Sequence, residues 1–197
     1  TVTIGAMARH AEVAASADVK SRIPALASLA GSIGDRQVRN MGTIGGALAN
    51  NDPAACYPAA VLALNGTVHT NKRQIAADAF FKGMYETALD EGELITSVSF
   101  PIPKKAAYIK YKQPASRFAL VGVFVSQGTG GVRVAVTGAK GSVFRVPELE
   151  AALAKIALAG SRRHVFFCTH GDCAPKEVGQ VSWNYLKRRL REVGLAD

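Results

Sequence analysis

The stretch RNMGTIGGALANNDPAACYP, residues 39–58, holds the residues best suited to chemistry, because it combines three glycines with a threonine. If Gly45 and Gly46 lead into a helix, their backbone amides and the helix N-terminus can bind an anion such as a pyrophosphate. Thr43 adds a hydroxyl donor, and the absent Cβ atoms of the two glycines let a phosphate approach the backbone. A plain turn is the alternative interpretation, and the stretch by itself leaves both open.

Short helices and strands must position these residues. The pattern predicts one strand and three helices in the first part of the chain, at residues 2–6, 7–16, 24–33 and 58–64. The second of these helices begins at a proline, which the first helical turn tolerates. Asp52 and Pro53 read as an N-cap and first helical turn, and Asn65 and Gly66 end the helix that follows.

The rest of the chain is richer in strands. A hairpin is predicted at 67–76, with its turn at Asn71 and Lys72, followed by a helical turn or two at 77–84. Strand-like runs separated by turn residues then predict an antiparallel sheet, at residues 93–100, 106–113, 119–127 and 132–139. A helix at 147–159, with Gly160 just beyond its end, closes this module. Strands followed by a packing helix indicate an α+β fold.

Composition limits the classes of function. The net charge of +9 is spread along the 197 residues and is not gathered into a basic stripe interleaved with aromatic residues, so we expect no nucleic-acid partner. No run approaches the ~18 apolar residues of a membrane span. Three cysteines do not make a disulfide framework, which favours a reducing cytoplasm. The four histidines show no metal-ligand spacing, and no catalytic triad or carboxylate pair stands out.

Residues 39–58 resemble the flavin loop of the medium, FAD-binding subunit of the molybdenum hydroxylases, a family that includes aerobic carbon monoxide dehydrogenase and xanthine dehydrogenase. Three further segments are similar to the same family, IGAMARHAEVAAS at 4–16, FFKGMYETALDEGELIT at 80–96 and AYIKYKQPASRFALVGV at 107–123. The carbon monoxide dehydrogenase branch is the most similar. The resemblance covers about residues 1–158, and the TIGG segment in this context is specific.

The resemblance implies an electron-transfer flavoprotein subunit. In such a complex a small subunit carries [2Fe-2S] clusters, a large subunit carries the molybdenum cofactor, and electrons leave through FAD to an external acceptor. The protein itself supplies binding, orientation and electrostatics to the flavin. The cofactor-binding residues that the resemblance implies are Thr43, Ile44, Gly45, Gly46, Asp52, Cys56, Leu94, Lys110 and Phe118.

These residues have different expected roles. The TIGG segment, residues 43–46, holds the FAD pyrophosphate in the family. Asp52 either contacts the ligand or caps a helix, and Cys56 stands where the family usually carries an acidic residue that contacts the nucleotide. By position, Leu94 lies near the adenine and Lys110 near the flavin, although without the resemblance Lys110 reads as a solvated strand lysine. At residue 118 a phenylalanine replaces the tyrosine that shields the isoalloxazine ring in many relatives, and it can still stack.

The predicted domains are a partial FAD-binding subdomain at 1–100, a C-terminal α+β subdomain at 101–160 and a fragment at 161–197. Family members begin with a second, AGG-type glycine loop that does not precede Thr1, so we expect a chain truncated at its front. A remnant that binds no cofactor is therefore one alternative function.

The tail carries the other alternative. It is similar to the opening β-loop-α unit of thioredoxin-like [2Fe-2S] ferredoxins, in which four cysteines hold the cluster. Cys168 and Cys173 would be the first pair, and the later pair is absent from this sequence. An iron–sulfur electron carrier is thus the second alternative function, with an incomplete ligand set.

Overall fold

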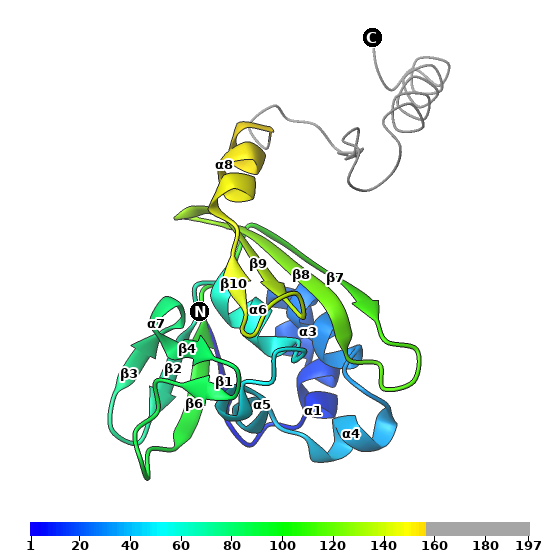
Figure 1. The fold of residues 1–197 in the computed structure, drawn as a ribbon, viewed down its shortest axis with the longest axis vertical. Coiled ribbons are helices and arrows are strands. Elements are labelled where there is room, and N and C mark those ends of the chain that lie inside the picture. Colours follow the sequence, from blue (N-terminus) through cyan, green and yellow to red (C-terminus); the bar gives the residue numbers. More distant parts are fainter. Residues whose placement is uncertain (157–197) are drawn as a thin grey trace. The chain divides into compact units, whose positions relative to one another are not determined.

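The structure, a computed structural model, describes residues 1–156 of the chain. Residues 1–158 form one compact unit. Its described part holds two sheets, a small hairpin and short helices that connect them (Figure 1), as expected for the predicted α+β fold. The iron–sulfur fragment predicted at 161–197, with Cys168 and Cys173, lies outside the described residues.

The first sheet is antiparallel and has the strand order β1-β6-β2-β3. Its strands are β1 (Val2–Gly5), β2 (Thr67–Thr70), β3 (Gln74–Ala76) and β6 (Ile95–Phe100). The predicted hairpin at 67–76 is confirmed. The run at 93–100, however, joins this sheet and not the later one, so that part of the prediction is wrong. Val98 lies opposite both Ile4 and Val68, and this buried apolar row fixes β6 between β1 and β2.

The second sheet has the order β10-β9-β8-β7 and is also antiparallel. Its strands are β7 (Lys105–Lys112), β8 (Ala119–Gly128), β9 (Gly131–Thr137) and β10 (Phe144–Arg145). The helix α8 (Pro147–Ile156) packs against β9 and confirms the described part of the predicted helix. A separate small hairpin joins β4 (Phe81–Gly83) to β5 (Glu86–Thr87).

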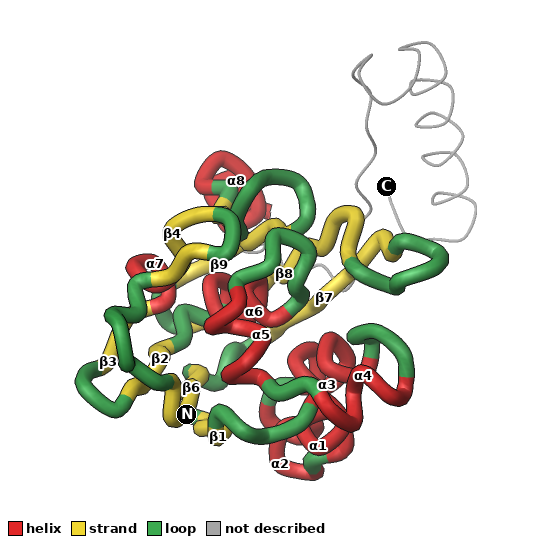
Figure 2. The backbone as a smooth tube through the Cα atoms, turned by 60° about the horizontal axis from the view of Figure 1, so that its bottom comes forward, coloured by secondary structure: helices red, strands yellow, loops and turns green. Residues whose placement is uncertain are grey.

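The helices fill the space beside the sheets (Figure 2). They are α1 (His10–Ala15), α2 (Ala17–Arg22), α3 (Pro24–Gly31), α4 (Arg36–Met41), α5 (Ile44–Asn50), α6 (Tyr57–Ala63) and α7 (Ala77–Phe80). Every residue of α6 is buried, because its sequence YPAAVLA is apolar all round and it packs against β8, β9, β10, α3 and α5. None of the described helices is long and apolar enough to cross a membrane.

Two of the short helices, α2 and α4, were not predicted. Each begins at a polar side chain that accepts a backbone N–H of the first turn, a usual N-cap. Ser16 Oγ accepts from Val19 at 3.3 Å, and Asp35 Oδ1 accepts from Val38 at 2.8 Å. Both helices have only six residues, which is too short for the hydrophobic period to show.

Candidate functional site

The glycine stretch folds as the start of a helix, which was one of its two predicted interpretations. Thr43 is the N-cap of α5, and its Oγ1 accepts the backbone N–H of Gly46 at 3.1 Å. The N–H of Gly45 donates to the carbonyl of Ala6 at 2.8 Å. Both glycine amides therefore have partners inside the chain, and the anion-site interpretation of these amides stays a prediction. A ligand here meets the Thr43 hydroxyl, which keeps its own proton to donate.

The three glycines of the stretch serve different contacts. A Cβ at Gly45 would lie 2.6 Å from the Cβ and 2.8 Å from the carbonyl oxygen of Ala6. A Cβ at Gly42 would lie 2.5 Å from Nε2 of His10. Gly46 is the least crowded of the three, since a Cβ there would meet a single side-chain atom, the Thr43 hydroxyl oxygen, at a tight 3.0 Å. The expected approach of a phosphate over missing Cβ atoms therefore fits Gly46, whereas Gly45 is required by packing.

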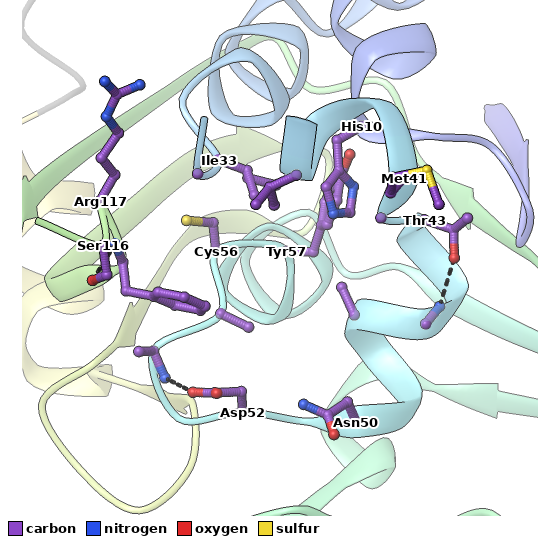
Figure 3. A pocket seen from close by; sticks show the side chains of 18 of the residues that line it. His10, Ile33, Met41, Thr43, Asn50, Asp52, Cys56, Tyr57, Ser116 and Arg117 are labelled. Carbon is purple, nitrogen blue, oxygen red and sulfur yellow. Dashed lines mark hydrogen bonds between the residues drawn. The ribbon is translucent and has the colours of Figure 1, made fainter. Parts of the chain in front are cut away.

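A cavity of about 430 Å³ lies beside this loop (Figure 3). Its walls are α4, the start of α5, the turn at 52–56 and the loop at 113–118 that follows β7. Six of the nine predicted cofactor-binding residues line it: Thr43, Gly46, Asp52, Cys56, Lys110 and Phe118. These six residues span positions 43 to 118, so the fold brings together side chains that are far apart in the sequence.

The other three predicted residues do not line the cavity. Ile44 is fully buried in the core, and Gly45 packs against Ala6. The side chain of Leu94 is 67% exposed, and its backbone N–H donates to Asn71 Oδ1 at 2.9 Å in the turn of the β2–β3 hairpin. The geometry therefore gives none of the three a direct place at this cavity.

Asp52 shapes the turn at 52–56 and does not cap α6. Its Oδ1 accepts the N–H of Ala54 at 2.8 Å, while α6 begins at Tyr57 without a side-chain cap (Figure 3). The predicted cap is wrong because an aspartate bonds more readily to a backbone amide two residues on, as here. Thr137 at the end of β9 secures the turn, since its hydroxyl lies 2.8 Å from the carbonyls of Pro53 and Ala55.

Lys110 is a structural tie in the cavity wall. Its Nζ donates to the carbonyl of Ser32 at 2.7 Å, to the carbonyl of Arg117 at 3.0 Å and to Sγ of Cys56 at 3.5 Å. An ammonium has three protons, so these partners use all of them. The interpretation of Lys110 as a solvated lysine is wrong. The side chain instead joins the end of α3, the turn before α6 and the loop after β7.

The thiol of Cys56 is buried, and its neighbours are the Lys110 ammonium and the Tyr108 phenol. Cys56 is 6% exposed, and it is a free cysteine in the described part of the chain. Burial, followed by the neighbouring Cys56, raises the pKa of the Tyr108 phenol above its ordinary value of 10.0. The phenol therefore stays protonated and neutral, and Lys110 supplies the positive charge at this wall.

Two buried polar side chains complete the cavity and were missed by sequence reasoning. His10 Nδ1 and the Tyr57 hydroxyl are shielded from water and have no hydrogen-bond partner among the described residues. The two rings stand 5.3 Å apart at 53° (Figure 3). Burial lowers the pKa of His10 and raises that of Tyr57, so both are neutral near pH 7. No spacing in the sequence links them, because His10 begins α1 and Tyr57 begins α6, and only the tertiary fold brings the two rings together.

Phe118 is the aromatic residue among the predicted residues that line the cavity. Its side chain is half exposed and lines the cavity. Two backbone hydrogen bonds close its loop, from Gln113 to the carbonyl of Phe118 and from Arg117 to the carbonyl of Gln113, both at 2.9 Å. Arg117 adopts a φ of 62°, and its side chain extends away from the labelled residues of the cavity (Figure 3). The loop thus presents an aromatic ring to one side and a cation to the other.

A cavity with a hydroxyl at a helix start, an aromatic ring at its edge and buried neutral polar groups suits a large, partly aromatic ligand. The sequence model of the FAD binding domain in molybdopterin dehydrogenase matches residues 1–103. The chain belongs to this family. The family and the FAD cofactor predicted from the sequence are thereby confirmed.

Known proteins of this family are similar over most of the chain. The glyceraldehyde dehydrogenase medium chain of Sulfolobus acidocaldarius is 36% identical over 160 residues, which cover 76% of this chain and 57% of the relative. The carbon monoxide dehydrogenase medium chain of Hydrogenophaga pseudoflava is 34% identical over 157 residues, which cover 74% of this chain and 55% of the relative. The chain thus spans a little over half the length of these relatives.

A solved structure shows the same fold. The crystal structure of the cyanide-inactivated Cu,Mo-CO dehydrogenase contains a chain that matches with a TM-score of 0.72 and 26% sequence identity. The match covers 95% of this chain and 72% of that chain. The predicted α+β fold is therefore confirmed, and the FAD-binding family domain has its expected architecture in this chain.

Proposed function

We propose that this chain is the FAD-binding part of the medium subunit of a molybdenum hydroxylase, similar to carbon monoxide dehydrogenase. The observation that carries the proposal is the cavity in which Thr43, Gly46 and Phe118 meet beside a buried, neutral polar wall. The family match supports FAD as the ligand. In this oxidoreductase the flavin accepts electrons singly from [2Fe-2S] clusters and passes them in pairs to an external acceptor.

The described residues fit FAD in the following roles. The Thr43 hydroxyl donates to a phosphate oxygen, and Gly46 leaves room for that phosphate because no Cβ intervenes. Phe118 stacks on an aromatic ring of the cofactor, which favours an offset or tilted geometry. Asp52 Oδ2 is turned toward the Tyr85 hydroxyl at 3.4 Å and can accept a hydrogen bond from a ribose hydroxyl. Cys56 closes the cavity where the family usually has a carboxylate.

Lys110 has a positioning role in this proposal. Its protons are all engaged with Ser32, Arg117 and Cys56, so it holds the Phe118 loop in place and does not donate to the cofactor. Ile44 and Gly45 act from behind the cavity, as packing residues of the α5 start.

We also propose a division of the compact unit into an FAD-binding subdomain at 1–100 and a C-terminal subdomain at 101–160. The first sheet ends with β6 at Phe100, and the second begins with β7 at Lys105, which supports a boundary between them. The cavity then lies between the two, because Lys110 and Phe118 belong to the second subdomain and the other predicted lining residues to the first.

The proposed partners are a large subunit with the molybdenum cofactor and a small subunit with [2Fe-2S] clusters. Medium chains and subunits of several complexes support this, including nicotine 6-hydroxylase of Paenarthrobacter nicotinovorans, which is 34% identical over 195 residues. The relatives are named for glyceraldehyde, nicotine and carbon monoxide, which are chemically unrelated. We therefore assign substrate oxidation to the large subunit and electron transfer through FAD to the medium subunit. A cytoplasmic location stays a prediction.

Titration of the full chain with FAD, followed by flavin fluorescence and absorbance, tests the proposal. We expect saturable binding, weakened roughly three- to tenfold by Phe118→Ala because stacking is lost. Tyr111→Ala is the matched control, since Tyr111 is 70% exposed on the neighbouring strand and does not line the cavity. A folded chain that binds no FAD would refute the proposal and favour the cofactor-free remnant. Equal weakening by both variants would remove Phe118 from the site.

A further inference from the structure

A second cavity, of about 370 Å³, adjoins the flavin cavity. It lies between the end of α3, Gly34, the last turn of α4 at Arg39, strand β7 and the loop at 113–118. Gly34, Lys110 and Arg117 line both cavities and form the wall between them. The cavity therefore adjoins the proposed FAD site and shares three lining residues with it.

The lining of this second cavity is strongly basic. Arg39, Lys110, Lys112 and Arg117 all line it, and no aspartate or glutamate does. None of the four forms an ion pair within residues 1–156. Four other arginines of the described chain, by contrast, have a carboxylate within 4.0 Å: Arg22, Arg73, Arg133 and Arg145. Cations gathered in a concave site without counter-charges attract anions.

Two of the four cations are held in position by neutral partners. Arg39 Nη1 donates to the carbonyls of Ile33 at 2.9 Å and Gly34 at 3.0 Å, and Lys110 donates to two carbonyls and a thiol. Neutral acceptors fix the side chains and leave their charges uncompensated. The remaining N–H groups of Arg39 stay available, since a guanidinium carries five. The site thus has positive charge in place before any ligand arrives.

The other two cations are placed to reach a ligand. Lys112 and Arg117 are exposed, and no hydrogen bond or ion pair of their side-chain nitrogens occurs among the described residues. A guanidinium fork matches the oxygens of a phosphate in bidentate geometry, and lysine adds a point charge.

We propose that this second cavity binds the phosphate group of a small molecule other than FAD. Its volume is within the range of small-molecule sites and exceeds what a lone ion would need. Lys110 and Arg117 line both cavities, so such a ligand would lie next to the flavin cavity. The inference goes beyond the proposed function, because Arg39 and Lys112 line the second cavity alone.

Calorimetric titration of the full chain, with and without saturating FAD, tests this site. The probes are inorganic phosphate, ribose 5-phosphate and uncharged ribose. We expect both phosphates to bind and ribose not to bind, with affinity that falls as salt is raised. Tighter binding of ribose 5-phosphate indicates an organic ligand, and equal affinity indicates a site for the free anion. Displacement of phosphate by FAD would overturn the proposal, because the phosphate would then occupy the FAD site.

Lys112 provides the selective variant, since it lines only the second cavity. Lys112→Gln is expected to weaken phosphate binding roughly three- to tenfold, and Lys112→Arg to restore it. Lys105→Gln is the matched control on the same strand, because Lys105 lines neither cavity. Unchanged phosphate affinity in Lys112→Gln, or no phosphate binding by the parent chain, would overturn the inference. FAD affinity, measured separately by fluorescence, should be the same in all these variants, so the two proposals fail independently.

Discussion

The flavin cavity and the phosphate cavity share a wall but recognise ligands by opposite means. The first is lined by an aromatic ring, a thiol and the neutral groups of His10 and Tyr57. The second is lined by four cations with no acidic neighbour. Lys110 lies in the wall that the two cavities share. Its N–H groups are used in hydrogen bonds to protein carbonyls, but its positive charge has no carboxylate partner among the described residues. Shape and stacking are thus expected to control FAD binding, and charge to control phosphate binding.

The largest effect is expected from Gly45→Val, which disturbs the packing behind the flavin cavity at the start of α5. The new side chain would overlap the backbone and Cβ of Ala6, which cannot yield as a flexible side chain would. Such overpacking costs about 1–3 kcal/mol, or more where backbone must move. We expect a lower melting temperature and loss of FAD binding in a fluorescence titration.

Gly46→Ala is the matched control for this effect. Its new methyl group meets only the Thr43 hydroxyl oxygen, a side-chain atom that can yield, so the melting temperature should fall much less than in Gly45→Val while FAD affinity falls. Equal melting temperatures for Gly45→Val and Gly46→Ala would show that the contact with Ala6 does not hold the loop.

Lys110→Met should weaken both cavities together. The substitution removes hydrogen bonds from a charged donor to two backbone carbonyls, which typically costs about 1–3 kcal/mol of folding free energy. FAD affinity falls because the Phe118 loop is released, and phosphate affinity falls because a charge is lost. Thermal melting and the two titrations measure these effects, with Lys105→Met as the control on the same strand. A loss confined to one cavity would contradict the shared-wall interpretation.

Cys56→Asp is expected to act on the two cavities with opposite signs. A carboxylate can accept hydrogen bonds from the nucleotide end of FAD, each worth about 1.5–3 kcal/mol, so FAD binding should tighten roughly tenfold. The same carboxylate lies near Lys110 Nζ, now 3.5 Å from the sulfur, and its negative charge should weaken phosphate binding. The two titrations show both signs.

Cys56→Asn separates charge from hydrogen bonding in this test. The amide has nearly the same size and no charge, so it should leave phosphate affinity unchanged. FAD affinity that is unchanged or weaker in Cys56→Asp would mean that this position does not face the nucleotide.

The sequence predicted the residues of the flavin cavity much better than those of the phosphate cavity. Thr43, Gly46 and Phe118 were found because local motifs carry the resemblance to the family. His10 and Tyr57 were missed because they are far apart in the sequence, and their rings meet only in the folded chain. The basic cavity was also missed. Its cations come from α4, β7 and a loop, and in the sequence they look like scattered surface charge.

The strands show the same limit. Alternating apolar residues correctly predicted that 93–100 is a strand, but alternation does not name its neighbours. The partners of β6 are β1, some 90 residues earlier, and β2. Gly45 is a further example, because the residue that excludes its Cβ is Ala6. Local patterns indicate what an element is, and long-range packing decides what it touches.

A third region, around Glu93, provides a reference outside both cavities. The Glu93 carboxylate is buried, and it accepts hydrogen bonds from Arg73 at 2.9 and 3.0 Å, from the Asp90 N–H at 2.9 Å and from the Thr70 hydroxyl at 2.7 Å. The Arg73 hydrogen bond, then those from Asp90 and Thr70, lower the pKa of Glu93 to about 2. Glu93 lines neither cavity.

Glu93→Gln should therefore have the smallest effect on ligand binding and a visible effect on acid stability. Because the pKa of Glu93 falls on folding, from 4.5 to about 2, its contribution is complete above pH 4.5 and is lost as the pH drops toward 2. Melting temperatures of the parent should fall more steeply than those of Glu93→Gln across that window, whereas FAD and phosphate affinities at pH 7 should be equal. Weaker FAD binding by the variant would bring the neighbouring Leu94 back as a nucleotide contact, since the substitution loosens the turn that holds it. Parallel melting curves from pH 4.5 to 2 would show instead that the Arg73 pair does not survive in solution.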